Sequence, residues 1–250
     1  MSEEQMKIKP IGEFEEICRP IITEHPEAPG FYGALGSSFL VASDDDHFYW
    51  VTALHNINNM PTGWLRIIPM DNSSVTLPFD EMITIGGGRD SETFKDIYIT
   101  RINMSQFIQN GDTPLKAQDV EKGFIPAENL KAGDELFVIG YPNERTEIDY
   151  TAQSILQTRC VLRAIYKEYD PLADHLHMAN ISTSIELRSY NGLSGSAVFY
   201  MDNKAINGTT YRFPLLVGMV LQGTASSGII RFVSSRVIFD IIRKAGSGSL

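Results

Sequence analysis

Three side chains of this chain are of the types that make a hydroxyl group attack an amide. They are His55, Asp96 and Ser194. Such a reaction needs a base to accept the hydroxyl proton, an acceptor that holds the base in one tautomer, and donors for the oxyanion that develops. A histidine, an aspartate and a serine can fill these roles if the fold brings them together.

His55 and Asp96 each stand at the end of a predicted strand. His55 follows the apolar run 50–54, which places an imidazole near the rim of a β-structure, and Asp96 opens the alternating run 96–102. Both patterns also have a common structural interpretation. A histidine after a strand and an aspartate at a strand entry occur in many proteins without a catalytic role.

Ser194 lies in a glycine-containing segment that precedes another predicted strand. Gly192 stands two residues before it and Gly195 directly after it. Glycines let the backbone turn tightly, so the backbone amides of Gly192 and Ser194 can point into one pocket. An ordinary glycine–serine turn between two strands is the alternative interpretation.

The elements around these residues are predicted to be short β-strands separated by turns, as in an all-β barrel or sandwich. After residue 233 the apolar period changes to that of a helix, with Val237, Ile238, Ile241 and Ile242 on one face. The predicted boundaries are an N-terminal arm or helix at 1–30, a β-rich half at 31–112, a connector at 113–124, a second β-rich half at 125–233, a C-terminal helix at 234–245 and a flexible tail at 246–250.

Composition excludes several classes of function. The formal net charge of −10 disfavours nucleic-acid binding, and no window of roughly 18 apolar residues suits a membrane span. The acidic N-terminus does not resemble a secretory signal, and Cys18 and Cys160 are expected to be free thiols, so we expect a cytoplasmic protein. His175 and His177 lack the further ligands of a zinc site, so no metal and no cofactor is expected.

Taken together, the three segments resemble the signature blocks of the trypsin-like (chymotrypsin-fold) serine peptidases. Residues 52–55 match T-A-x-H, residues 96–99 match D-I-x-[LIV], and residues 192–197 match G-x-S-G-[GS]-[PA]. The order histidine, aspartate, serine also agrees with that family. The serine segment is most similar to the bacterial branch that includes the glutamyl endopeptidases, and the resemblance covers about residues 31 to 245.

The resemblance implies a fold and a set of roles. The halves 31–112 and 125–233 would be two six-stranded antiparallel β-barrels, the first with His55 and Asp96 and the second with Ser194. His55 would be the general base, Asp96 its orienting partner and Ser194 the nucleophile, with the amides of Gly192 and Ser194 as the oxyanion hole. The substrate would pair with the edge strand formed by Leu221, Gln222 and Gly223.

Two departures from the family bear on activation and specificity. Leu193 replaces the aspartate that pairs with a newly cut N-terminus, and no activation sequence is present. Counting back from Ser194 places Arg188 and Ser189 at the floor of the primary pocket, where a guanidinium would favour an acidic substrate residue. Arg188 turned outward is the alternative. Val220 stands where the glutamyl branch has a histidine.

The sequence therefore predicts a serine endopeptidase that forms an acyl-enzyme and acts on a peptide or protein substrate. A catalytically silent, protease-like peptide-binding module is the alternative from another class. A protease active only under certain conditions, in a regulated stress or defence response with an unidentified activating partner, is a third interpretation. It is favoured by the absence of a zymogen sequence.

Overall fold

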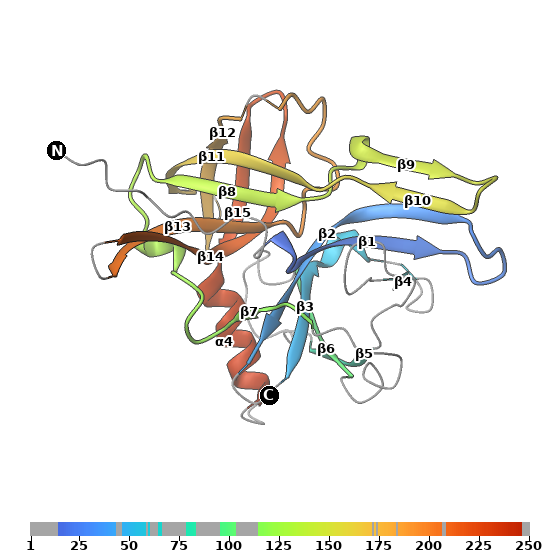
Figure 1. Ribbon diagram of the computed structural model, residues 1–250, viewed down its shortest axis with the longest axis horizontal. Coiled ribbons are helices and arrows are strands. Elements are labelled where there is room, and N and C mark those ends of the chain that lie inside the picture. The colour runs from blue at the N-terminus through green and yellow to red at the C-terminus, as the bar shows by residue number, and fades with distance from the viewer. Residues whose placement is uncertain are drawn as a thin grey trace.

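The structure is a computed structural model that describes residues 15–43, 47–58, 60, 65–66, 79–83, 96–103, 115–171, 173, 175–183, 185–206 and 209–246. In these ranges the chain is built mostly of antiparallel strands and ends in a helix (Figure 1). The predictions of an all-β chain and of a C-terminal helix are confirmed. Residues 1–14, residues 113–114 of the predicted connector and the tail after Gly246 lie outside the described residues.

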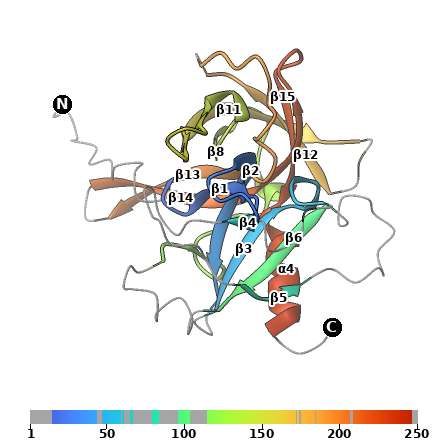
Figure 2. The same ribbon diagram turned by 90° about the vertical axis from the view of Figure 1, so that its right-hand side faces the viewer.

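The N-terminal half forms a sheet that carries His55 and Asp96. Its strands follow the order β4-β1-β2-β3-β6-β5 with antiparallel pairing (Figure 2). The short strand β7 pairs with β2 in parallel. In the described ranges this path is open, whereas the sequence predicts a closed barrel. The strands are β1 (Cys18–Glu24), β2 (Tyr32–Ala42), β3 (Phe48–Ala53), β4 (Leu65–Arg66), β5 (Phe79–Ile83), β6 (Ile97–Ile102) and β7 (Gln118–Asp119).

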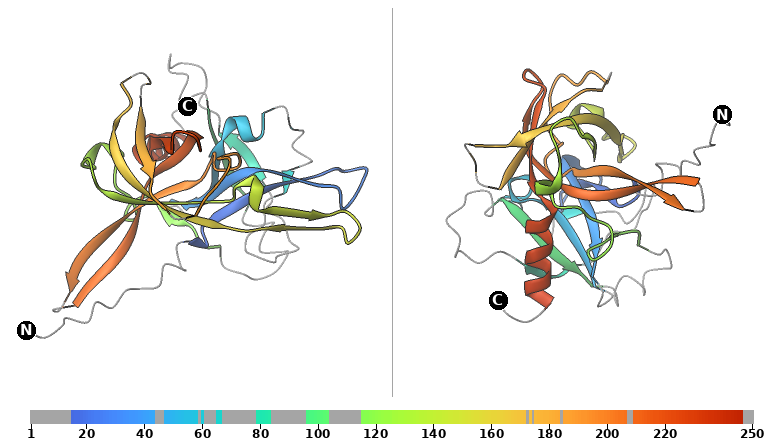
Figure 3. Two further views of the ribbon diagram at one scale, coloured as in Figure 1. Left: turned by 90° about the horizontal axis from the view of Figure 1, so that it is seen from above. Right: turned by 90° about the vertical axis from the view of Figure 1, so that its left-hand side faces the viewer.

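The C-terminal half contains a closed barrel of six strands in the order β11-β12-β15-β14-β13-β8. A separate hairpin, β9–β10, lies between β8 and β11 along the chain, and the paired ends of β13 and β14 project from the barrel (Figure 3). The elements are β8 (Glu135–Gly140), β9 (Thr146–Asp149), β10 (Ser154–Gln157), β11 (Cys160–Tyr169), β12 (Leu176–Ile181), β13 (Ala197–Ile206), β14 (Thr209–Thr224), β15 (Ile229–Ser234) and α4 (Ser235–Gly246).

The predicted arm or helix at 1–30 is wrong over part of its length. Cys18–Glu24 is the strand β1, which pairs with β2 along its whole length and with β4 at one end. Six of its seven residues are buried. A strand covered on both faces has no alternation of apolar and polar residues, so its period of two is not visible in the sequence.

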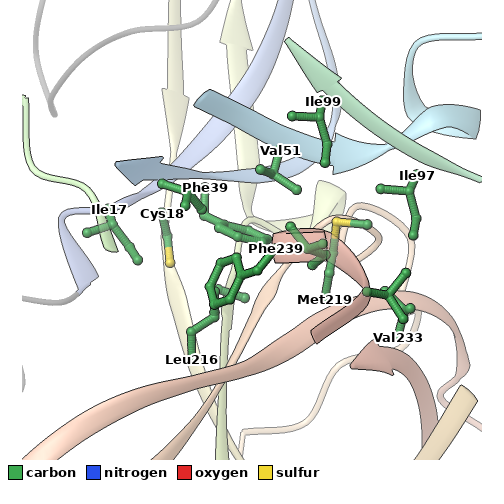
Figure 4. Packing of buried hydrophobic residues seen from close by; sticks show 14 of the residues in the cluster. Ile17, Cys18, Phe39, Val51, Ile97, Ile99, Leu216, Met219, Val233 and Phe239 are labelled. Carbon is green, nitrogen blue, oxygen red and sulfur yellow. The ribbon is translucent and has the colours of Figure 1, made fainter. Parts of the chain in front are cut away.

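Apolar side chains from both halves and from α4 meet in one buried cluster. Figure 4 shows Phe39, Val51 and Ile99 of the first sheet close to Met219 of the barrel and Phe239 of α4. Fully burying a side chain of this size stabilises a fold by about 1.5–3 kcal/mol. The cluster therefore holds the sheet that carries His55 against the barrel that carries Ser194.

Candidate active site

His55 lies on a short 3-10 turn, η1 (Leu54–Asn56), that directly follows β3. The backbone amide of Leu54 donates to the carbonyl oxygen of Asp96 at 2.9 Å, and the amide of His55 donates to the Asp96 carboxylate at 3.0 Å. These bonds attach the turn to the residue that enters β6. The pairing of β3 with β6 thus fixes both the backbone and the imidazole of His55.

The imidazole of His55 is held by the carboxylate of Asp96. Its Nδ1 lies 2.8 Å from Oδ2 and 2.9 Å from Oδ1 of Asp96. An ionised carboxylate can only accept hydrogen bonds, so Nδ1 is assigned the proton and Nε2 is left as an acceptor. This is the tautomer that a general base needs in order to take a proton from a hydroxyl group.

Ser194 lies in the turn that leads into β13, between two glycines with positive φ. Gly192 has φ +89° and Gly195 has φ +83°. Residues with a side chain rarely adopt this backbone conformation. A Cβ on Gly195 would also lie only 1.9 Å from the carbonyl oxygen of Ser37. The glycines are therefore required for the backbone of this turn and for its close approach to the first sheet.

The hydroxyl group of Ser194 points to the strand β14 in this structure. Its Oγ donates to the carbonyl oxygen of Leu221 at 3.2 Å, in place of a bond to His55. A β-bulge between Val220 and Gln222 makes Leu221 the extra residue on its strand and re-aims the backbone there. Proton transfer to His55 would require the Ser194 hydroxyl group to donate to Nε2 of His55 instead, and catalytic hydrogen bonds often tighten only when substrate binds.

The backbone around Ser194 can hold an oxyanion. Within the described residues, the amides of Gly192 and Ser194 donate to no other group, whereas the amide of Leu193 donates to Tyr190 O and that of Gly195 to Val220 O. Leu193 is buried among the apolar residues of the barrel. The turn is thus anchored at alternate residues, and the two amides that the sequence singles out remain available.

Two polar residues of the first sheet hold this turn in place. Ser37 on β2 donates through its amide to Ser194 O at 3.1 Å and through its hydroxyl group to Gly192 O at 2.6 Å. Asn56, next to His55, donates to Ser194 O at 2.8 Å. Both residues are buried. The carbonyl groups of Gly192 and Ser194 therefore point toward these two residues.

One cleft brings the predicted catalytic residues together. It has a volume of about 550 Å³ and is open to solvent at His55, whose side chain is 45% exposed. The residues that line it are Ala34, Leu35, His55, Asn56, Asp96, Asn143, Tyr190, Asn191, Gly192, Leu193, Ser194, Val220, Leu221, Gln222, Gly223 and Ile230.

The predicted edge strand lines this cleft, but the predicted pocket floor does not. Leu221, Gln222 and Gly223 are all in the lining, whereas Arg188 and Ser189 are absent from it. Arg188 is exposed, and the backbone amides of both residues donate to the carboxylate of Glu144, at 3.0 and 3.2 Å. Neither residue is in the lining, so the placement of Arg188 and Ser189 at the floor of the primary pocket stays a prediction.

Several cleft and turn residues were not identified from the sequence, and four of them have polar side chains. They are Ser37, Asn56, Asn143 and Tyr190. Asn56 directly follows the candidate histidine, and that adjacency is the one sequence signal that pointed to it. The others act through contacts between residues far apart in the chain, such as the bond between Ser37 and Gly192, which are 155 positions apart.

The remaining titratable candidates are separate from the cleft. His177 is a buried histidine of β12, and its Nδ1 lies 2.9 Å from the hydroxyl group of Tyr166. Burial lowers the pKa of His177 and raises the pKa of the Cys18 thiol to about 12. Cys18 and Cys160 are both free and buried.

Two features are absent from the described part of the chain. There, no group of three or more histidine, cysteine, aspartate and glutamate side chains is arranged to hold a metal ion. No helix in those ranges has the length and apolar character needed to cross a membrane. No protein-family model matches the chain, and no curated protein matches it in sequence. Functional conclusions therefore depend on the geometry of the cleft.

Proposed function

We propose that this chain is a serine endopeptidase of the trypsin-like class. The observation that carries the proposal is the convergence, in one cleft, of the His55–Asp96 pair, the Ser194 hydroxyl group and two free backbone amides. The sheet and the barrel would correspond to the two barrels of that class. The substrate would be a peptide or protein segment that pairs with the edge of β14 at Leu221–Gly223.

In the proposed reaction, the Oγ of Ser194 attacks the carbonyl carbon of the scissile amide while its proton passes to Nε2 of His55. Negative charge on the carbonyl oxygen is stabilised by the amides of Gly192 and Ser194, each worth roughly 3–4 kcal/mol in the transition state. His55 then donates the proton to the leaving nitrogen, and the carbon–nitrogen bond breaks. Water, deprotonated by His55, releases the acyl group from Ser194.

Asp96 would act through His55 and would not itself accept the proton. Its carboxylate contacts both the Nδ1 and the backbone amide of His55, so it fixes the orientation of the ring and stabilises the imidazolium that forms. The bonds from Ser37 and Asn56 to the serine turn take the place of an ion pair made by a new N-terminus. This supports a protein that folds with its oxyanion hole already formed.

A catalytically silent peptide-binding module is the second candidate. It is favoured by the bond of the Ser194 hydroxyl group to Leu221 O instead of to His55. The unpaired edge of β14 would serve either function. A regulated role in stress or defence, with an activating partner, remains a further proposal.

A peptide-library digestion separates the two candidates. The wild-type chain should cleave peptides internally, and Ser194→Ala should lose the activity by at least about 10⁴-fold. Ser196→Ala is a matched control, because this serine lies two residues away with a buried hydroxyl group. It should retain most of the activity. A folded wild type that cleaves nothing, or equal cleavage by Ser194→Ala, would contradict the peptidase.

A further inference from the structure

Tyr190, Val220, Gly223 and Ile230 line the same cleft as Ser194, and we call the part of the cleft that they line the recess. Pairing of β13 with β14 stops at Met219, so β13 does not cover the edge at residues 221–223. A peptide that pairs with this edge and places a carbonyl group at Ser194 brings the side chain of that same residue next to the recess. The recess thus selects the residue on the acyl side of the cleaved bond.

The recess is narrow where it meets Gly223. A methyl group built on Gly223 would lie 3.1 Å from Cδ2 of Tyr190 and 3.1 Å from Cγ2 of Ile230. Ile230 is the cross-strand partner of Gly223, which explains why its side chain reaches this point. Although Ile230 lines the cleft, its exposed fraction is 0%. The tyrosine ring and the isoleucine side chain therefore close the inner end of the recess.

The recess also offers no charge to a substrate. Among the described residues that line the cleft, the ionisable ones are His55, Asp96 and Tyr190, and only Tyr190 lies in the recess. Burial raises the pKa of Tyr190, so its hydroxyl group stays neutral at pH 7. A lysine or glutamate side chain in this recess would lose water without gaining a counter-ion, which is strongly unfavourable.

We propose that this recess takes a small uncharged side chain, so that the preferred residue on the acyl side is alanine or valine. The inference rests on the proposed function, since it uses Ser194 to place the substrate. It replaces the acidic preference that Arg188 suggested. A long aromatic side chain is rejected by the closed inner end, and a charged one by the apolar walls.

The test measures binding separately from catalysis. NMR titrations on Ser194→Ala would compare acetylated tetrapeptides that share three alanines and end in alanine, valine, phenylalanine, lysine or glutamate. We expect the alanine and valine peptides to bind at least about tenfold more tightly than the other three, a ratio typical of a misfitting group in an apolar pocket. Tighter binding of the phenylalanine, lysine or glutamate peptide, equal binding of all five, or no binding would overturn the proposal.

Two tyrosine variants locate the preference. In the Ser194→Ala background, Tyr190→Ala should open the recess and improve binding of the phenylalanine peptide at least about tenfold. Tyr200→Ala is the matched control, because Tyr200 packs against the same apolar cluster but does not line the cleft. It should leave the order of affinities unchanged. The same change in both variants would overturn the assignment of Tyr190.

The binding result and the proposed function fail in different ways. If the wild type cleaves no peptide while Ser194→Ala keeps the preference for alanine and valine, the peptidase is contradicted and the recess assignment stands. If the wild type cleaves preferentially after glutamate or lysine, the recess assignment is contradicted and the peptidase stands.

Discussion

Replacing Gly192 by alanine should remove most of the catalytic activity at a modest cost in stability. The added Cβ would lie 2.4 Å from Oδ1 of Asn143, 2.6 Å from the backbone nitrogen of Asn143 and 2.6 Å from the carbonyl oxygen of Tyr141. Two of these three atoms belong to the backbone, so the turn itself must shift. Its φ of +89° adds about 1–2 kcal/mol of strain for a residue with a side chain.

The shift moves one of the two amides that would stabilise the oxyanion. Loss of one such donor costs about 3–4 kcal/mol in the transition state, so kcat should fall by roughly 10²- to 10³-fold. KM should change little, because the donor acts mainly after the carbonyl carbon is attacked. Steady-state kinetics on a peptide anilide would give kcat and KM, and guanidinium chloride unfolding would give the free energy of unfolding.

Gly133→Ala provides the matched control for backbone strain. Gly133 has φ +96°, and a Cβ on it would meet nothing within 4 Å. We expect a loss of about 1–2 kcal/mol in the free energy of unfolding from the φ strain alone, with kcat unchanged. If kcat of Gly192→Ala stayed within about threefold of the wild-type value, or fell equally in Gly133→Ala, the oxyanion argument would be refuted.

Three other substitutions test the surrounding structure. Asn56→Ala removes one of the donors to Ser194 O and should lower kcat by about five- to tenfold with little change in KM, as kinetics on the same anilide would reveal; an unchanged kcat would contradict a positioning role. Burial lowers the pKa of His177 below its ordinary 6.5. As the pH falls, this histidine is therefore protonated in the unfolded chain before it is protonated in the folded chain. The contribution of neutral His177 to the free energy of unfolding is thus complete above about pH 6.5 and declines below it. Urea unfolding at pH 7 and pH 5 should show that the free energy of unfolding changes less with pH in His177→Phe than in the wild type. An equal change with pH in both proteins would count against this. Arg231→Ala should lower the free energy of unfolding by about 1.5–3 kcal/mol, because it removes the charged hydrogen bond of 2.6 Å from Nε of Arg231 to the buried Asp170 carboxylate; a melting temperature equal to that of the wild type would contradict this.

The sequence predicted the catalytic candidates better than their surroundings. His55, Asp96 and Ser194 stand in short motifs whose local backbone, a strand end or a glycine turn, can be recognised without tertiary information. The structure brings these residues to one cleft. Their roles depend on local geometry that a few neighbouring residues determine, which is why short motifs carry the signal.

The pocket could not be predicted by counting along the chain. Arg188 stands at the expected distance from Ser194, yet it is exposed and is not among the residues that line the cleft. The side chains that do form the recess, Tyr190 and Ile230, come from separate segments that meet at Gly223. Such convergence depends on strand register, which the sequence does not reveal.

Strand β1 was missed for a related reason. Its residues are covered on both faces, so apolar and polar positions do not alternate, and a short apolar stretch of this kind is compatible with a helix or an arm. The C-terminal helix was predicted correctly because Ile238, Ile241 and Ile242 repeat with helical spacing, and the structure buries that face against the barrel.

The central claim is that Ser194 is a nucleophile activated by His55. The most direct measurement is the mass of the intact protein after reaction with a fluorophosphonate, followed by digestion to locate the modified residue. The account predicts one phosphonyl group on Ser194 of the wild type, none on Ser194→Ala and a strongly reduced rate of labelling in His55→Ala. A folded wild type that stays unlabelled, or labelling of Ser194 at the same rate in His55→Ala, would contradict it.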